Sequence, residues 1–393
     1  MKKGVIAGFA GGVGISAVLV VGMLFTGTLR IGAANDYAKI WNKVGVLEQY
    51  IDTYYLEEVD ETKYADGIYK GLLESLGDEY AEYYTEEEYQ DLLESTSGKY
   101  CGIGAQVMQD KETGVISISL PFEGSPAAEA GLRPGDVIYK VAGEEVTGKD
   151  LTAVVAKIKG EEGTTLEMQI YRDGKYLDVE IERREIEVPT VEYEMLDNSI
   201  GYIAVSSFDE VTDKQFCDAL EDLESQGQKG LVIDLRNNGG GRLDICVNML
   251  DRMLPEGTIV STKTKAGTGE TFTSTDKESF DKPLVVLINE NSASASEVFV
   301  GAIRDYEMGT LVGTKSFGKG IVQSIFDLKD GTAIKFTTSE YFSPKGNNIH
   351  GTGFVPDVEV ELDKEVQTMI SIPKEKDNQL QMAIEVITDK IQN

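Results

Sequence analysis

Histidine is almost absent from this chain of 393 residues, which contains a single one, His350. One imidazole excludes the metal sites that are built from several histidines, and it makes His350 the sole imidazole base to consider. Cysteine is also scarce. Cys101, Cys217 and Cys246 show no CxxC spacing, and an odd number cannot form a complete set of disulfides. We therefore expect free thiols, no metal site and no cofactor.

Basic residues are few as well. The 37 lysines and arginines stand against 68 acidic residues, which gives a formal net charge of -31. Such a chain repels the phosphates of nucleic acids and anionic membrane surfaces, so we expect no nucleic-acid partner. The length predicts two or three domains, and 41% hydrophobic residues with 42 glycines indicate a globular protein with many turns.

Charge is missing from one long stretch near the start of the chain. Lys2 and Lys3 precede an uncharged run over residues 4–29, which is long enough to cross a bilayer as a helix. Because lysines stay in the cytoplasm, this run predicts a single-pass anchor in the cell membrane with the rest of the chain extracytoplasmic. A cleaved signal peptide is the alternative, with small residues at 32–34 as its cleavage site. Either reading assigns residues 1–34 to a signal or anchor.

The two ends of the exported part have helical patterns. Apolar residues recur at helical spacing over Tyr37–Tyr55 and Ala65–Leu76, so residues 35–97 predict a helical arm. A second helical pattern lies within residues 371–393. The arm is either a solvated pair of helices or a dimerisation element, and we expect a homodimer.

Residues 98–184 predict a compact β-rich domain, with a strong hairpin turn at Asp173-Gly174. Three motifs in it resemble a PDZ domain of bacterial proteases: Gly102–Ala105, Gly124–Ala127 and Gly131–Asp136. The resemblance implies that the loop of Gly102, Ile103, Gly104 and Ala105 offers backbone amides to the carboxylate at the C-terminus of a peptide. The peptide would then add as a strand to the sheet. The alternative is a β-domain that acts as a spacer.

Residues 185–370 alternate strands with helices, which predicts an α/β core. Gly230–Leu235 and Leu284–Ile288 are apolar enough to be buried strands, and the second of them runs into the sequence NSASASE at 291–297. A serine at a turn from a strand to a helix is exposed, and the helix amides nearby can stabilise an oxyanion. Ser294 is therefore a candidate nucleophile, although serines are also common helix caps.

A serine nucleophile needs a base, and lysine can serve if burial lowers its pKa. Lys319 lies between Gly318 and Gly320, just before a predicted strand over Ile321–Phe326. Strand alternation would put Gln323 on the same face as Lys319, where it could steady the amine. The alternatives are a solvated Lys319 in a hairpin, and His350 as the base.

The sequence DLRNNGGG over Asp234–Gly241 follows another buried strand. Its backbone amides could bind an anion, either an oxyanion or a phosphate. The motif lacks the Lys-Ser/Thr ending of a nucleotide-binding P-loop, which argues against nucleotide hydrolysis.

Together, DLRNNGGG, NSASASE, the FGKG motif around Lys319 and the PDZ motifs resemble the tail-specific, or carboxyl-terminal processing, peptidases of family S41, from about residue 40 to 365. The resemblance implies a crotonase-like α/β core, with Ser294 as nucleophile, Lys319 as general base and Gln323 in support. It also implies Gly241 and Ala295 as oxyanion donors. The partners would be protein or peptide substrates that are cut near nonpolar C-terminal tails.

Two other functions stay open from the sequence. A non-catalytic adaptor could carry the PDZ domain on a retained peptidase fold, and a crotonase-like acyl enzyme could use the glycine-rich loop. The joint presence of Ser294, Lys319 and Gln323 favours the peptidase, because no structural need calls for all three.

Overall fold

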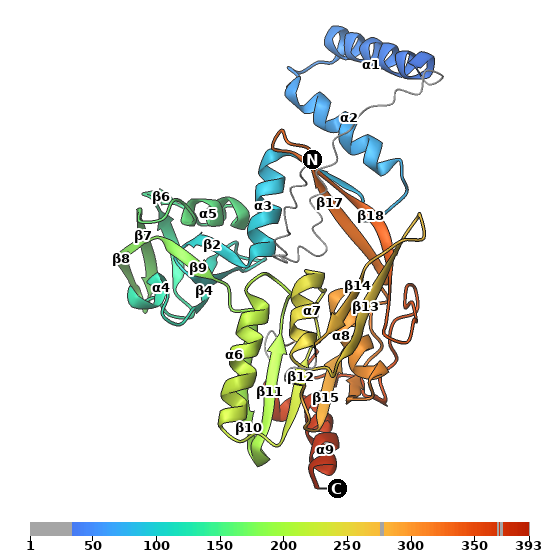
Figure 1. The fold of residues 1–393 in the computed structure, drawn as a ribbon. Coiled ribbons are helices and arrows are strands. Elements are labelled where there is room, and N and C mark those ends of the chain that lie inside the picture. Colours follow the sequence, from blue (N-terminus) through green and yellow to red (C-terminus); the bar gives the residue numbers. More distant parts are fainter. Residues whose placement is uncertain (1–33, 276–278, 368, 370–371, 393) are drawn as a thin grey trace, which may run out of the picture. The chain divides into compact units, whose positions relative to one another are not determined.

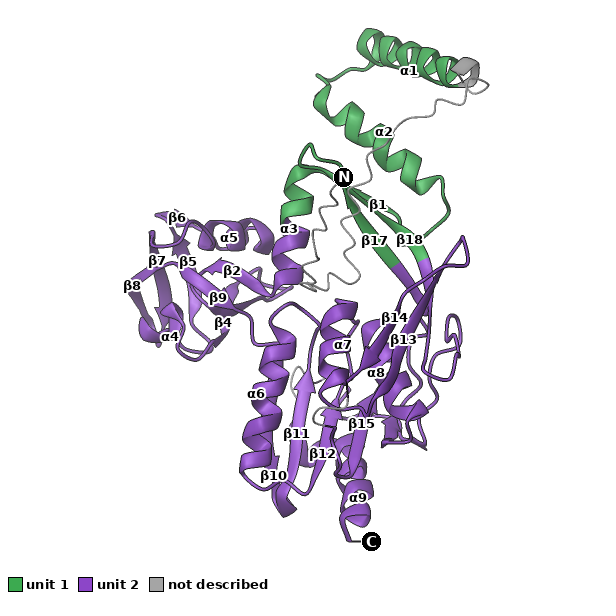
Figure 2. Cartoon of the chain, viewed as in Figure 1, with its two compact units in different colours: residues 1–90, 323–338 green, residues 91–322, 339–393 purple. Residues whose placement is uncertain are grey.

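The computed structural model describes residues 34–275, 279–367, 369 and 372–392 (Figure 1). The predicted anchor over residues 4–29 lies outside the described residues, as does most of the predicted cleavage site. None of the described helices is both long and apolar enough to cross a lipid bilayer. The chain divides into two compact units, residues up to 90 with 323–338, and residues 91–322 with 339 onward (Figure 2).

The first unit holds most of the predicted helical arm. Its helices are α1 (Ala34–Tyr54) and α2 (Thr62–Glu74), followed by the short strand β1 (Glu82–Tyr84). Strand β1 pairs antiparallel with the first residues of β18 (Ala333–Phe342), which also pairs with β17 (Ile321–Asp327). The helical periodicity thus predicted α1 and α2, but three residues were too few for a pattern that would reveal β1.

The second unit includes a β-rich part. After α3 (Glu86–Ser97), the strands β2 (Lys99–Gly102) and β9 (Arg184–Glu187) pair with each other. Between them lies a six-stranded antiparallel sheet with two short helices: β3 (Ala105–Gln109), β4 (Ile116–Pro121), α4 (Pro126–Glu129), β5 (Val137–Val141), β6 (Glu144–Glu145), α5 (Leu151–Ile158), β7 (Thr165–Arg172) and β8 (Lys175–Glu182).

This part has its own hydrophobic core, formed by alternate apolar residues of the strands and by the inner faces of α4 and α5, among them Ile116, Ile118, Ala127, Ile138, Val154, Leu166 and Ile170. Ser125 caps α4 by accepting a hydrogen bond from the Ala128 amide, with Pro126 at the first helical position, as the sequence predicts. The order of strands is β3-β4-β5-β7-β8, so β3 lies at one edge of the sheet, beside the loop that ends at Ala105.

The rest of the second unit is an α/β sheet in the order β10-β11-β12-β15-β16-β19. Its edge strand β10 (Val191–Leu196) is antiparallel to β11 (Ile200–Val205). The parallel strands are β11, β12 (Gly230–Asp234), β15 (Leu284–Ile288), β16 (Gly309–Gly313) and β19 (Val358–Glu359). Every residue of β12 and β15 is buried, which explains their continuous apolar runs.

Helices cover this sheet: α6 (Thr212–Ser225), α7 (Leu243–Asp251), α8 (Ala295–Asp305) and α9 (Asn378–Gln392). Helix α9 packs Leu380, Ala383 and Ile387 onto residues that include Val232 and Val285. Strands β13 (Gly257–Thr264) and β14 (Thr271–Ser274) form a further antiparallel pair, and β13 pairs with residues 339–342 of β18. The carboxyl ends of β12 and β15 carry the DLRNNGGG and NSASASE sequences, so parallel pairing brings these two motifs to one edge.

Candidate active site

Ser294 occupies the turn between β15 and α8, directly before the first helical residue. Its backbone has φ 57° and ψ -115°, a left-handed conformation that is strained for a residue with a side chain. The side chain is half-buried, whereas Ala293 and Ala295 on either side are buried. The predicted nucleophile thus lies at a strained turn from a strand to a helix N-terminus.

The hydroxyls of the other two serines of the run are hydrogen-bonded to backbone carbonyls. The hydroxyl of Ser292 donates to the Leu235 carbonyl at 2.8 Å, and that of Ser296 donates to the Asn238 carbonyl at 2.9 Å. Both serines are fully buried. These hydroxyls hold the turn against the glycine-rich loop, and Ser294 is the partly exposed serine of this run.

The glycine-rich loop lies against the Ser294 turn. A side chain on Gly240 would come within 2.8 Å of the Ser294 Cβ and 3.0 Å of the Ala295 nitrogen, so this position must be glycine. The Gly240 amide donates to Asn238 Oδ1 at 2.8 Å and is therefore engaged. Gly241, the next residue, is exposed. The prediction that the amides of Gly241 and Ala295 serve as oxyanion donors stays a prediction.

Lys319 lies in a loop just before β17 and not in the strand itself. The alternation argument that put Lys319 and Gln323 on one strand face therefore does not apply. The flanking glycines are required by close approach: a side chain on Gly318 would meet the Gly353 nitrogen at 2.9 Å, and one on Gly320 would meet the His350 nitrogen at 2.5 Å. The loop that carries Lys319 therefore packs closely against the segment 350–353.

One buried carboxylate joins the Ser294 turn to the Lys319 loop. Glu297 Oε2 accepts hydrogen bonds from the amides of both Ser294 (3.1 Å) and Lys319 (2.7 Å). Glu297 Oε1 accepts from the Gly318 amide at 2.7 Å and from the Ser316 hydroxyl at 2.6 Å. Four donors compensate the cost of burying this carboxylate, which is 1% exposed. The structure thus brings Ser294 and Lys319 together, although 25 residues separate them in the sequence.

The other two residues that the sequence suggests beside Lys319, Gln323 and His350, have separate surroundings. Gln323 belongs to the first unit, where its Nε2 donates to the Thr337 hydroxyl at 3.2 Å. His350 is exposed, and its amide donates to Asn348 Oδ1 at 2.8 Å. The support of Lys319 by Gln323 stays a prediction.

The predicted carboxylate-binding loop connects β2 to β3. Its carbonyls at Ile103 and Gly104 accept hydrogen bonds from the amides of Ala127 (2.8 Å) and Phe122 (2.9 Å), which fix the loop. Burial raises the pKa of the Tyr100 phenol, while the backbone amides of Ala105 and Gly104 act in the opposite direction. Two of the amides that the sequence assigns to a peptide carboxylate therefore lie near a side chain of the same domain.

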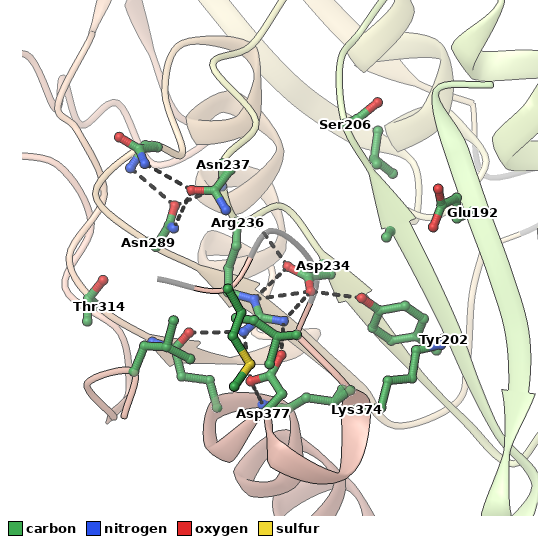
Figure 3. Close-up of a pocket in the computed structure, with 18 of the residues that line it drawn as sticks. Glu192, Tyr202, Ser206, Asp234, Arg236, Asn237, Asn289, Thr314, Lys374 and Asp377 are labelled. Atoms are coloured by element: carbon green, nitrogen blue, oxygen red, sulfur yellow. Dashed lines mark hydrogen bonds and ion pairs between the residues drawn. The ribbon is translucent and has the colours of Figure 1, made fainter. Parts of the chain in front are cut away.

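A cavity of about 1040 Å³ lies at the same edge of the α/β sheet (Figure 3). It is lined by Asn237, Asn289 and Asn291, whose side chains hydrogen-bond to one another, and by a buried ionic network around Arg236 (Figure 3). Neither Ser294 nor Lys319 is among the described residues that line it.

The Arg236 network explains the first half of the DLRNNGGG motif. The Arg236 guanidinium donates to Asp234 (2.6 Å), to Asp377 (2.7 Å) and to Gln379 (3.0 Å), and Tyr202 donates to Asp234 at 2.9 Å. All its nitrogens are engaged, so the network anchors the loop to α9 and offers no free cation to a ligand. Within the described ranges, no group of three or more His, Cys, Asp or Glu residues could hold a metal ion. Metal independence stays a prediction.

Sequence reasoning missed Glu297, Asn238 and Tyr341. The spacing of Ser294 and Glu297 is that of a capping box, so Glu297 could have been found from its position three residues after a helix cap. Asn238 and Tyr341 carry no such local signal, because their partners are remote in the sequence.

Comparison with known proteins agrees with this geometry. Residues 199–360 match peptidase family S41, and residues 118–172 match a PDZ domain. A probable CtpA-like serine protease of Staphylococcus aureus (strain MSSA476) is 37% identical over 367 residues, which cover 92% of this chain and 73% of that protein. A probable CtpA-like serine protease of Staphylococcus haemolyticus (strain JCSC1435) is 35% identical, over 91% and 73% of the two chains.

A solved structure of a putative S41 protease from Bacteroides fragilis NCTC 9343 shares the fold, with a TM-score of 0.53 over 86% of this chain and 91% of that chain, at 18% identity. The family resemblance inferred from the motifs is confirmed. With a curated relative this similar over most of both chains, the protein belongs to peptidase family S41 and is a serine peptidase that carries a PDZ domain.

Proposed function

We propose that this chain is an endopeptidase that cuts exported or membrane-associated proteins near their C-termini by means of a Ser294-Lys319 dyad, on a crotonase-like core. The observation that carries the proposal is the shared partner of the two residues: one oxygen of Glu297 accepts hydrogen bonds from the amides of both. The strained backbone of Ser294 supports it, because such strain is kept where function needs it.

In this mechanism the neutral Lys319 amine takes the proton of the Ser294 hydroxyl as its oxygen attacks the scissile carbonyl. The amides of Gly241 and Ala295 stabilise the oxyanion, and Gln323 supports the amine. The lysine then gives its proton to the departing amine, which leaves an acyl-enzyme. Water, activated by the same lysine, hydrolyses that ester and releases Ser294.

The PDZ domain would select substrates through their tails. Strand β3 is an edge strand beside the loop of Gly102, Ile103, Gly104 and Ala105, which suits the addition of a peptide as a further strand. We also propose that residues 4–29 anchor the protein in the cell membrane with its catalytic part outside, on the strength of the uncharged run after Lys2 and Lys3. The exposed apolar side chains of α1 favour a homodimer.

The dyad is tested by hydrolysis of an unstructured protein in the presence of EDTA. Ser294→Ala, Lys319→Ala and Lys319→Arg should lose turnover by more than about a thousandfold while staying folded, because arginine cannot give up its proton. His350→Ala should keep most of the activity. Full turnover by Lys319→Ala, or loss of turnover in His350→Ala alone, would assign the base to another group.

Matched controls come from the same serine run. Ser292→Ala and Ser296→Ala each remove one buried hydroxyl that donates to a backbone carbonyl, so each should lower the free energy of unfolding by about 1–3 kcal/mol. They should nevertheless retain turnover where they are folded. Thermal denaturation measured beside the activity separates this loss of stability from a loss of chemistry.

A further inference from the structure

Tyr341 of β18 bridges the two loops that carry the proposed nucleophile and base. Its hydroxyl lies within hydrogen-bonding distance of the Ser294 carbonyl, at 3.1 Å, and of the Lys319 carbonyl. We propose that Tyr341 is a positioning residue, whose hydroxyl holds the backbones of Ser294 and Lys319 at the separation that proton transfer needs. This inference rests on the proposed dyad.

The hydroxyl is suited to act as a permanent donor. Tyr341 is 4% exposed, and both of its partners are carbonyl oxygens, which can only accept. Burial, with the negative charge of Glu297 nearby, raises the pKa of Tyr341 well above its usual value, so the phenol keeps its proton. Its single O–H proton is thus available to the two carbonyl oxygens at any pH at which the peptidase would work.

The position of the ring is itself fixed from several sides. Tyr341 lies opposite Thr262 of β13 in the antiparallel pair, and its amide donates to the Gly320 carbonyl at 3.2 Å. The side-chain amide of Asn348 donates to the carbonyls of both Gly320 (3.1 Å) and Tyr341 (2.9 Å). The strand and the Lys319 loop therefore form one hydrogen-bonded body, from which the phenol reaches across to the Ser294 turn.

Tyr341 and Glu297 hold the same two residues, Ser294 and Lys319, through different backbone groups. The Glu297 carboxylate accepts from the amides of Ser294 and Lys319, whereas the Tyr341 hydroxyl donates to their carbonyls. Glu297 also fixes Gly318 and Ser316 and is needed to build the loop, so its removal would report mainly on folding. Tyr341 touches only the two carbonyls through its hydroxyl in the described structure, and that hydroxyl can be removed alone.

The test is Tyr341→Phe in the full chain, which keeps the ring and removes the hydroxyl. A misplacement of about 1 Å between reacting groups can cost a hundredfold in rate, and one lost hydrogen bond permits a smaller relaxation. We expect kcat for peptide hydrolysis to fall by about tenfold with KM unchanged, because the hydroxyl faces the dyad backbone and not a bound substrate. Replacement by 4-aminophenylalanine, which restores a donor, should recover most of the lost kcat.

The matched control is Tyr306→Phe at the far end of α8. Its hydroxyl also donates to a backbone carbonyl, that of Thr258 at 3.0 Å, but it is remote from the Ser294 turn. This variant should lose a similar amount of stability and no kcat. A Tyr341→Phe protein with the kcat of the wild type would overturn the proposal, and so would one that is unfolded at the assay temperature or is not rescued by 4-aminophenylalanine.

The proposed dyad and the proposed role of Tyr341 can be rejected independently of each other. Ser294→Ala and Lys319→Ala are measured in the same series, and full activity in either would reject the dyad. If both are inactive while Tyr341→Phe and Tyr306→Phe are indistinguishable, the dyad stands and the role of Tyr341 is rejected.

Discussion

Tyr100 places its phenol oxygen against the amides of Gly104 and Ala105, in the loop that the sequence assigns to peptide binding. Its ring lies so close to Gly102 that a side chain there would approach it to 2.8 Å, and the Lys159 ammonium lies 5.4 Å from the ring centroid. If a ligand carboxylate uses these amides, we expect it to compete with the Tyr100 phenol for them.

Tyr100→Phe should bind a peptide with a free C-terminal carboxylate about three- to tenfold more tightly, since the two amides no longer have an internal partner. Fluorescence anisotropy with a labelled nonpolar peptide, beside its C-terminally amidated form, measures this. Tyr139→Phe is the control, because its hydroxyl contacts the exposed Glu145 and not the loop. Weaker binding by Tyr100→Phe would show that the hydroxyl helps the ligand.

Local sequence signals pointed to the residues proposed to react, but not to those that contact their backbones. Ser294 and Lys319 stand out through their neighbours, an apolar strand followed by serines and a pair of glycines. Tyr341 lies 47 residues after Ser294, and its hydrogen bonds depend on the register of β18 against β13. Three successive glycines likewise look alike in the sequence, and it takes the backbone to show that Gly240 meets Ser294 while Gly241 meets Phe208.

Among the elements, the β-rich domain is held by a buried ion pair that joins β7 to the turn before β5. Arg172 donates to Asp136 at 2.5 Å and 2.6 Å and to the Gly131 carbonyl at 2.8 Å. Burial acts to raise the pKa of Asp136, but the hydrogen bonds from Arg172 and from the Arg133 amide, with the charge of Arg172, outweigh it and lower the pKa.

A lowered folded pKa means that this contribution to stability is present above the unfolded value, near pH 4, and is lost as the pH falls through the folded value. Asp136→Asn should lower the free energy of unfolding of this domain by about 3 kcal/mol at pH 7 and weaken its loss of stability below pH 4. Hydrogen exchange in β4, β5 and β7 measures the change.

The control for that ion pair is Glu129→Gln, which removes an exposed partner of Arg184. Exposed pairs contribute less than about 1 kcal/mol, so this variant should be close to the wild type. Equal effects of the two substitutions would mean that burial of Asp136 adds nothing to the strength of its ion pair.

Elements with a clear hydrophobic pattern could be predicted from the sequence, whereas elements that mix polar, charged and aromatic residues could not. The continuous apolar runs of β12 and β15 predict buried strands, and both strands are present. Strand β18 mixes lysine, threonine and aromatic residues with a mostly half-buried pattern, which neither the strand nor the helix period describes. Strand β18, which carries Tyr341, was therefore missed, although its neighbour β17 was predicted as Ile321–Phe326 and the α/β core was expected.

On the scale of the whole molecule, the motifs predicted a serine peptidase with a PDZ domain, which the comparisons confirm. No sequence motif indicates the oligomeric state of the protein, so we infer it from the exposed surface. Helix α1 exposes a series of large apolar side chains, including Tyr37, Ile40, Trp41, Val46, Leu47, Tyr50 and Tyr54. Trp41 is 55% exposed and Leu47 is 53% exposed. An exposed apolar helix surface of this extent is characteristic of an interaction surface.

A second copy of the same helix is the partner that this face predicts, because antiparallel or parallel pairing would bury the apolar series of both copies against each other. The protein from residue 34 onward should therefore have the mass of a homodimer in multi-angle light scattering. Trp41→Glu with Leu47→Glu should convert it to a monomer, since charges would be buried without partners. Asn42→Asp places a charge on the same helix at an exposed polar position and should leave the dimer intact. A wild-type protein with the mass of one chain, or a dimer that survives the double substitution, would remove α1 from the interface and return the arm to the alternative of a solvated pair of helices.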